Sequence, residues 1–472
     1  MKVINPRTGS SDYELREDDP IAVARMAKAV REANSEWASL NVKDRAAVLA
    51  NWLEHLKEQK DALIEQLSID TGRIKIARIE IEGVFGLISG WIYRAPQLIM
   101  ESGERPSVTA SSVQIRQRWV PYELVGVISP WNFPLLLALI DTIPALMAGA
   151  SVLLKPSEVT PRFMDPLQTS IEAVPELAAV FKLIRGGAEA GKAVVQEADA
   201  ICFTGSVPTG KLIAKACAER LIPAFLELGG KDPAIVLEDA DLDLSTDAIL
   251  RSCVGATGQA CQSLERIYVA APILDEFVSK LVEKAKAVEL TTNIGLGQLG
   301  PIIYRDQALK IQSQLEEAVA AGAKLHCGGK VEEIGGALWC RPTVLTNVDH
   351  SMKIMQEETF GPVIPIMPFS SEEEALQLAN DSIYGLSGSV FSQNQDQALA
   401  VAAQMEVGAV SINDASLTNK VYDAEKHAFK QSGLNGSRMG AAGILRFFRK
   451  QALLIQTARP ATMADFEENQ ER

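Results

Sequence analysis

The chain has 472 residues, of which 47% are hydrophobic and 22% charged, with a formal net charge of −14 at pH 7. This length is too great for one simple core, so we expect two or three domains. The negative charge disfavours nucleic acid or an anionic membrane surface as a partner, because both would require a basic face.

Six cysteines and four histidines are scattered along the chain without a Cys-x-x-Cys pair. The sequence therefore predicts no metal site. The start, Met1 to Pro6, reaches a turn at once and does not resemble a signal peptide. Free thiols and no visible export signal favour a cytoplasmic location.

The first hundred residues show the periodicity of amphipathic helices. Helices are predicted over residues 18–36, 42–59 and 61–68, with a longer one from Thr71 toward Tyr93. Over residues 113–125 the alternation of apolar and polar residues changes to a period of two, which predicts an exposed strand or hairpin arm. An exposed edge strand invites pairing with another chain.

A strand–helix alternation follows, with strands predicted at 125–128, 151–154, 180–184 and 201–203. The longest apolar stretch, 133–150, contains Asp141 and two prolines, so we expect a buried helix and loop and no membrane span. Further helices are predicted over residues 163–174 and 211–219. A strand, a glycine turn and a helix around Gly205 and Gly210 are typical of dinucleotide binding. The G-x-G-x-x-G spacing is absent, so a plain helix cap remains the alternative.

The second half repeats the α/β pattern. Helices are predicted at 274–288, 306–321 and 371–380, with strands near Val344 and Val363 and at 387–391 and 408–412. Residues 445–455 form a strand or a helix, and the polar tail 461–472 is predicted to be disordered.

Two stretches carry candidate chemistry. Cys261 lies between small and polar residues, just ahead of an apolar run that predicts a strand. Glu227 is framed by two leucines and followed by two glycines, and a Glu in apolar surroundings can act as a base near neutral pH. A thiol and a carboxylate in one pocket suit catalysis through a thioester that water cleaves. A lone Cys, however, is usually a small buried hydrophobe. Asn132, in a Pro-rich turn, could donate to a developing oxyanion or simply satisfy the turn.

Taken in order, Pro130–Pro134, Leu226–Lys231 and Gly258–Cys261 resemble the signature motifs of the aldehyde dehydrogenase superfamily, and the resemblance extends from Asn5 to about Ile455. It implies an α/β fold with a variant Rossmann cofactor domain, an α/β catalytic domain and a small β oligomerisation arm. It also implies that Cys261 is the nucleophile, Glu227 the general base and Asn132 the oxyanion donor.

The resemblance further implies a division of the chain. Residues 1–112 and 126–229 would bind the dinucleotide, 230–429 would form the catalytic domain, and 113–125 and 430–460 would mediate assembly into a homodimer or homotetramer. NAD is expected as cofactor, with NADP possible. The implied cofactor residues are Ser129, Trp131, Lys155, Glu158, Gly205, Ser206, Gly210, Gly229, Glu358 and Phe360. The implied substrate tunnel is lined by Phe133, Leu137 and Ile140.

The sequence thus predicts NAD(P)-dependent oxidation of a small-molecule aldehyde to the acid. The uncharged tunnel residues favour an apolar aliphatic, aromatic or apocarotenal-like aldehyde. The alternatives are a semialdehyde dehydrogenase, with Lys426 or Arg438 binding a carboxylate, and a cofactor-binding protein without turnover. Two stretches depart from the family pattern: Gly255–Thr257 replaces a common Phe and Asn, and the loop at 415–430 lacks Pro-Phe-Gly-Gly. Because this loop shapes the mouth of the substrate tunnel in the family, the resemblance defines the reaction more closely than the substrate.

Overall fold

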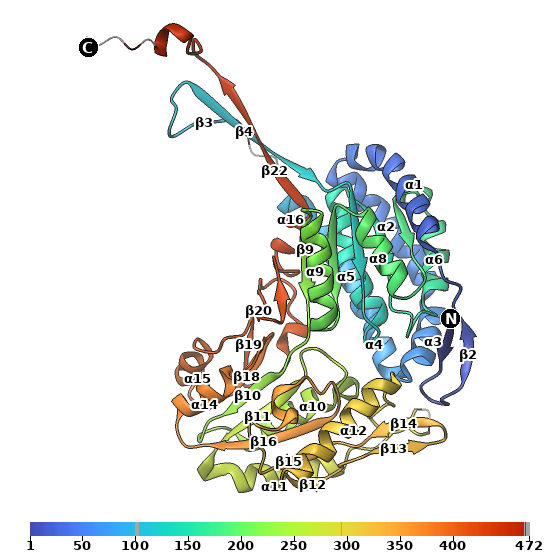
Figure 1. Cartoon of the computed structure of the whole chain (residues 1–472), viewed down its shortest axis with the longest axis vertical. Helices are drawn as coiled ribbons and strands as arrows, with labels where there is room; N and C mark the ends of the chain where they lie inside the picture. The colour runs from blue at the N-terminus through green and yellow to red at the C-terminus, as the bar shows by residue number, and fades with distance from the viewer. Residues whose placement is uncertain (100–102, 294, 467, 469–472) are drawn as a thin grey trace.

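A computed structural model of the chain describes residues 1–99, 103–293, 295–466 and 468. Two parts, each built around a largely parallel sheet, lie side by side, and a thin three-stranded arm projects from one end (Figure 1). The first part is blue to green in the figure, and the second is yellow to orange. The residues predicted to be catalytic lie where the two parts meet.

The first part contains a six-stranded sheet with the order β21-β9-β8-β5-β6-β7, parallel except for β21. Its strands are β5 Leu124–Ile128, β6 Ser151–Lys155, β7 Phe181–Leu183, β8 Ala200–Thr204, β9 Ala224–Glu227 and β21 Gly433–Leu434. Its helices are α1 Pro20–Ser39, α2 Val42–Glu58, α3 Lys60–Thr71, α4 Ile74–Leu98, α5 Pro134–Ala148, α6 Met164–Glu172, α7 Pro175–Val180, α8 Ala188–Glu197 and α9 Val207–Glu219.

The strand order of this sheet creates a ligand crevice. The chain passes from β5 outward to β7 and then returns to the other side of β5 with β8. Such a reversal opens a crevice at the carboxyl ends of parallel strands. The buried helix α5 follows β5 directly; Pro134 stands at its first turn and Gly149, at φ 105°, ends it.

Two predicted helices differ from the structure. The helix predicted at 163–174 ends at Glu172, and Pro175 begins the separate helix α7, because proline favours a first turn and disrupts a helix interior. The helix predicted from residue 211 begins at Val207 with Pro208 in its first turn, so Gly210 lies within α9 and not in the preceding loop.

The second part contains a seven-stranded sheet with the order β12-β15-β16-β11-β10-β18-β19, antiparallel only at β12. Its strands are β10 Asp232–Val236, β11 Leu264–Ala270, β12 Lys324–Cys327, β15 Thr343–Thr346, β16 Val363–Phe369, β18 Gly388–Phe391 and β19 Val410–Ile412. Its helices are α10 Leu242–Val254, α11 Leu274–Lys286, α12 Arg305–Ala320, α13 Lys353–Gln356, α14 Glu372–Asn380 and α15 Gln395–Ala402, with the 3₁₀ turns η1 Gly255–Gly258 and η2 Ala271–Ile273.

After β19 the chain returns to the first sheet. It passes through η3 Leu417–Asn419, pairs β20 Phe429–Lys430 with β17 Tyr384–Gly385, and then adds β21 antiparallel to β9. Residues 433–434 thus belong to the sheet of the first part, whereas the sequence assigned 430–460 to assembly. The short helix α16 Ala442–Leu445 leads from there to the arm.

The arm consists of β3 Arg105–Pro106, β4 Val113–Pro121 and β22 Phe448–Gln456, paired antiparallel over nine residues of β4 and β22. It projects away from both sheets (Figure 1). The predicted strand 113–125 is therefore two strands, since Leu124 already belongs to β5. Residues 463–466 of the predicted disordered tail form the turn η4 Met463–Phe466, while residues 467 and 469–472 lie outside the described part.

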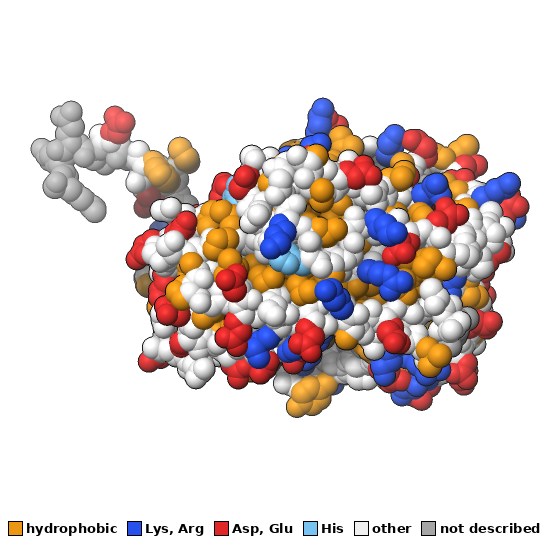
Figure 2. Space-filling view, turned by 90° about the horizontal axis from the view of Figure 1, so that it is seen from below, with side chains coloured by type: hydrophobic (Ala, Val, Ile, Leu, Met, Phe, Trp, Pro, Cys, Tyr) orange, Lys and Arg blue, Asp and Glu red, His pale blue; other side chains and the backbone are white. Residues whose placement is uncertain are grey.

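Two small hairpins complete the fold: β1 Lys2–Ile4 with β2 Ser11–Glu14, and β13 Val331–Ile334 with β14 Ala337–Cys340. On the end face of the molecule in Figure 2, acidic and basic side chains are interspersed among hydrophobic ones. No helix in the described ranges has the length and apolar character that crossing a membrane requires.

Candidate active site

Cys261, Glu227 and Asn132 line one small cavity of about 120 Å³ at the junction of the two sheets. Cys261 precedes β11 of the second sheet, Glu227 ends β9 of the first, and Asn132 lies in the turn between β5 and α5. Leu137 of α5 lines the same cavity. A thiol, a carboxylate, an amide and an apolar wall therefore meet around one point.

The backbone before Cys261 is strained. Ala256 and Thr257 have φ of 52° and 63°, a left-handed conformation that costs free energy for residues with a Cβ. Gly258 follows at φ 66°, and a Cβ on it would collide with backbone atoms of Gly361, so only glycine fits there. Such strain persists where the surroundings enforce it, often at functional sites.

A buried guanidinium ties this loop to the turn that bears Asn132. Arg73, just before α4, donates to the carbonyl of Ala256 at 2.8 Å and to the carbonyl of Asn132 at 2.5 Å. The Asn132 amide nitrogen donates to the carbonyl of Gln259 at 2.9 Å. That nitrogen carries two hydrogens, so one of them remains for another acceptor.

Glu227 faces a second buried charge network. Its Oε1 lies 3.6 Å from Nε of Arg438, whose Nη2 donates to Asp141 at 3.0 Å and to Thr204 Oγ1 at 2.5 Å. Arg446 also binds Asp141. Paired buried ions of this kind hold side chains in fixed positions, because breaking a pair leaves an uncompensated charge. The network therefore orients the Glu227 carboxylate.

The thiol is disfavoured as an anion in this structure. Burial raises the pKa of Cys261 to about 11, with the Lys426 ammonium opposing the shift and the Glu227 carboxylate adding to it. A thiolate at this position thus needs a base to take its proton or a cation to stabilise it. Glu227 and Lys426 are candidates for these two tasks.

The loop containing Glu358 and Phe360 closes the cavity on one side. Its backbone is held by Glu265, which accepts from the amides of Thr359 at 2.6 Å and Phe360 at 2.7 Å. Lys231 binds Glu265 at 2.8 Å from the opposite side. Burial, together with the Glu265 charge, raises the pKa of Glu358 to about 7. Lys231 thus positions this loop through Glu265.

A larger groove of about 690 Å³ adjoins the cavity along the carboxyl ends of the first sheet. It is lined by Ser129, Trp131, Lys155, Glu158, Gly205 and Ser206 among others. The Ser129 hydroxyl is buried there without a hydrogen-bond partner among the described residues, and Lys155 Nζ donates to Glu158 at 2.8 Å. These groups fit the phosphates and ribose hydroxyls of a dinucleotide, with the first turn of α9 alongside.

Some sequence-predicted residues lie elsewhere. Gly210 does not line the groove; a Cβ on it would lie 2.5 Å from the side chain of Leu228, which indicates close packing of α9 against the residue that follows β9. Ile140 is 4% exposed within the core of the first part. The Phe133 ring lies against the Arg73 guanidinium, 5.5 Å from its centroid. Gly229 lines the catalytic cavity instead of the groove, beside the Glu358 carboxylate.

Sequence reasoning missed Arg73 and Asp141 as site residues. The signal for Asp141 was present, because one carboxylate inside an apolar helix requires a buried partner. Arg73 gave no comparable signal, since its contacts are backbone carbonyls far along the chain. In the described ranges no group of three or more potential metal ligands occurs.

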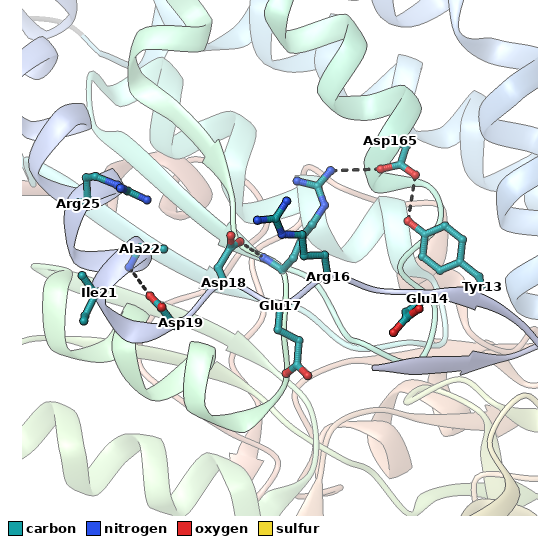
Figure 3. A pocket seen from close by; sticks show the side chains of 11 residues that line it. Tyr13, Glu14, Arg16, Glu17, Asp18, Asp19, Ile21, Ala22, Arg25 and Asp165 are labelled. Carbon is teal, nitrogen blue, oxygen red and sulfur yellow. Dashed lines mark hydrogen bonds and ion pairs between the residues drawn. The ribbon is translucent and has the colours of Figure 1, made fainter.

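A separate pocket lies between β2, the start of α1 and α6 (Figure 3). Asp165 accepts there from the Tyr13 hydroxyl at 3.0 Å and binds Arg185 at 3.2 Å. Asp18 accepts from the Arg185 amide at 2.7 Å, and Asp19 caps α1. These groups serve to hold the N-terminal segment against α6.

The groove and the adjoining cavity with its thiol and carboxylate are typical of a dinucleotide-dependent oxidoreductase. The aldehyde dehydrogenase family model matches residues 1–453, so the chain belongs to the aldehyde dehydrogenase family. It is an NAD(P)-dependent aldehyde oxidoreductase with the fold that its sequence predicted.

Three related proteins illustrate the similarity. The chain is 34% identical to a protein of Mycolicibacterium smegmatis assigned as a succinate-semialdehyde dehydrogenase [NADP(+)], covering 91% of this chain and 83% of that one. A solved structure from Anabaena variabilis, assigned as the aldehyde dehydrogenase PutA, matches with 50% identity, a TM-score of 0.95 and 98% of both chains covered. A betaine aldehyde dehydrogenase from Staphylococcus aureus, in complex with NAD+, matches with 32% identity, a TM-score of 0.91 and coverage of 98% and 92%.

Proposed function

We propose that Cys261 attacks the aldehyde carbonyl, that Asn132 and the Cys261 backbone N–H bind the resulting oxyanion, and that Glu227 activates the water that releases the acid. A nicotinamide ring held in the groove would supply the hydride acceptor, so that the substrate carbon bound to Cys261 would become a thioester. Glu227 can also take the thiol proton beforehand, which would offset the cost of a buried thiolate.

The observation that supports these roles is the meeting of the thiol, amide and carboxylate in one cavity beside the groove. The test is formation of NADH from NAD and a panel of aliphatic, aromatic and acid-bearing aldehydes. A protein that only binds the cofactor would form no NADH with any member of the panel while still binding NAD.

We predict a preference for NAD over NADP, set by Glu158. A carboxylate accepts hydrogen bonds from ribose hydroxyls but repels a 2′-phosphate. Glu158→Gln should lower the ratio of kcat/KM for NAD to that for NADP by roughly tenfold, since like-charge contacts are costly. Glu176→Gln, an exposed acid on α7, is the matched control and should leave the ratio unchanged. A wild-type protein that uses NADP equally well would contradict the role of Glu158.

We also propose that the arm mediates self-association into a homodimer or homotetramer. Leu453, Leu454 and Ile455 of β22 are 37%, 69% and 39% exposed, and an exposed apolar strand favours pairing with another chain. Leu454→Glu should shift the protein to smaller species in sedimentation velocity, whereas Gln451→Glu on the same strand should not. An unchanged distribution of species would contradict the role of the arm in self-association.

The cytoplasmic location stays a prediction, consistent with six free cysteines.

Two substrate classes remain as proposals. An apolar aldehyde is supported by Leu137, which lines the cavity. The other two predicted tunnel residues are engaged elsewhere: Ile140 packs in the core and Phe133 lies against Arg73. An aldehyde with an acid group is supported by Lys426, a buried lysine whose charge acts on Cys261. The substrates in the names of the relatives carry opposite charges: succinate semialdehyde has a carboxylate, and betaine aldehyde has a quaternary ammonium. The charge at the far end of the substrate is therefore the property that separates these relatives.

A further inference from the structure

The segment between β19 and β21 is anchored on both sides of the catalytic cavity. At its start, the Ser416 hydroxyl donates to the carbonyl of Gln262, next to Cys261, at 2.9 Å. At its end, Gly433 pairs in register with Glu227. The segment thus connects the surroundings of the nucleophile to those of the carboxylate, and Lys426 lies between these two anchors.

Lys426 is buried without a partner. The residue is 9% exposed, and its Nζ has no hydrogen-bond partner in the part of the chain that the structure describes. Buried ammonium groups normally have acceptors, because three unused donors and an unpaired charge cost much free energy. Of the neighbouring charges, this ammonium contributes most to lowering the pKa of the Cys261 thiol. Its charge therefore acts on the reacting centre.

The other charges of the site are already engaged. Arg438 lies 3.0 Å from Asp141 and 3.6 Å from Glu227. The Asp232 carboxyl is influenced by Lys426 but accepts hydrogen bonds from the amide and hydroxyl of Ser387. Burial raises the pKa of Asp232 to about 7, so this group neutralises Lys426 only in part. Lys426 is left as a cation available to an added anion.

We propose that Lys426 binds a carboxylate at the far end of the aldehyde substrate, so that short acid-bearing aldehydes are preferred. The inference deepens the proposed function and rests on Cys261 as the nucleophile. A carboxylate would satisfy the unused donors through a charge-assisted hydrogen bond. Leu137 would contact the methylene groups between the two ends, which gives the apolar wall a place in the same site.

The first test compares two substrates of nearly equal shape, succinic semialdehyde and its neutral methyl ester. Lys426→Met should lower kcat/KM for the acid by roughly 30-fold or more, as loss of one partner of a buried charge pair does. The value for the ester should fall by a smaller factor, because the ester loses only the effect of the Lys426 charge on the thiol. The acid-to-ester ratio of kcat/KM should therefore fall by roughly tenfold or more. Lys420→Met, an exposed lysine on the same loop, should change neither value. An equal fall for both substrates would show that Lys426 acts only on the thiol and would overturn the proposal, as would no change for the acid.

A second readout does not require turnover. Butanoate, a carboxylate without an aldehyde, should protect Cys261 of the wild-type protein from iodoacetamide, measured by mass spectrometry of the Cys261 peptide. Protection is expressed as the ratio of the alkylation rates without and with butanoate in the same variant. It should be lost in Lys426→Met and retained in Lys426→Arg. The arginine variant still tests the site if the methionine variant does not fold. Protection without any aldehyde oxidation would support the carboxylate site and contradict the proposed reaction. Absence of protection in the wild type would overturn the carboxylate site alone.

Discussion

Replacing Cys261 with alanine is expected to abolish aldehyde oxidation while dinucleotide binding survives. The groove that fits the dinucleotide is lined by residues of the first part, and Cys261 is not among them. Without the thiol no thioester can form, and loss of a covalent nucleophile typically lowers kcat by roughly 10⁴-fold or more. The measurement is steady-state NADH formation, together with NAD binding by calorimetry on the same preparation.

Cys253→Ala is the matched control for this prediction. The Cys253 thiol is fully buried and donates to the carbonyl of Leu264 at 3.0 Å, so it serves packing. We expect activity to remain in this variant after allowance for a small loss of stability. An active Cys261→Ala variant alongside an inactive Cys253→Ala variant would refute the assignment of the nucleophile.

The pH dependence of alkylation follows from the same environment. The thiolate is the reactive form, and burial raises the pKa of Cys261 to about 11. In the protein without ligands, the rate of alkylation by iodoacetamide should therefore keep rising between pH 8 and about 10, and not level off near the ordinary thiol pKa of about 8.5. A plateau below pH 8 would show that a base or a cation already ionises the thiol.

Local patterns predicted the elements well because periodicity and turn chemistry act over a few residues. The parallel strands after Leu124 and the buried helix α5 follow from continuous apolar runs, and the motifs around Glu227 and Cys261 indicated the residues that line the cavity. The predicted helix over 163–174 stopped before Pro175, but the six-residue helix α7 that Pro175 begins was not predicted.

Long-range ion pairs could not be read from the sequence. Asp141 and Arg438 are 297 positions apart, and their 3.0 Å contact exists only after the segment following β19 returns to the first sheet. The proposed role of Lys426 also depends on that return, because residues 433–434, at the start of the predicted assembly segment, pair with β9 beside Glu227. Sequence spacing cannot reveal that an ammonium lacks a partner, because this depends on every group that packs around the side chain in the folded protein.

Replacing Glu227 with glutamine is expected to leave the fold intact but to slow release of the acid. The amide keeps the shape of the side chain and cannot accept a proton from water, so the thioester persists on Cys261. Loss of a general base typically costs roughly 10²–10⁴-fold in rate. Rapid mixing should therefore show a burst of NADH followed by slow turnover, and mass spectrometry should detect the acylated Cys261 peptide.

The size of that burst separates two tasks of Glu227. If Glu227 also takes the proton of the thiol, the burst itself becomes slower, and raising the pH should restore it because hydroxide then ionises Cys261. If Glu227 acts only on water, the burst keeps its wild-type rate at neutral pH. Glu238→Gln, an exposed acid after β10, should retain both phases. Wild-type steady-state rates in Glu227→Gln would exclude it as the base and direct the search to Glu358, the other carboxyl that lines the cavity.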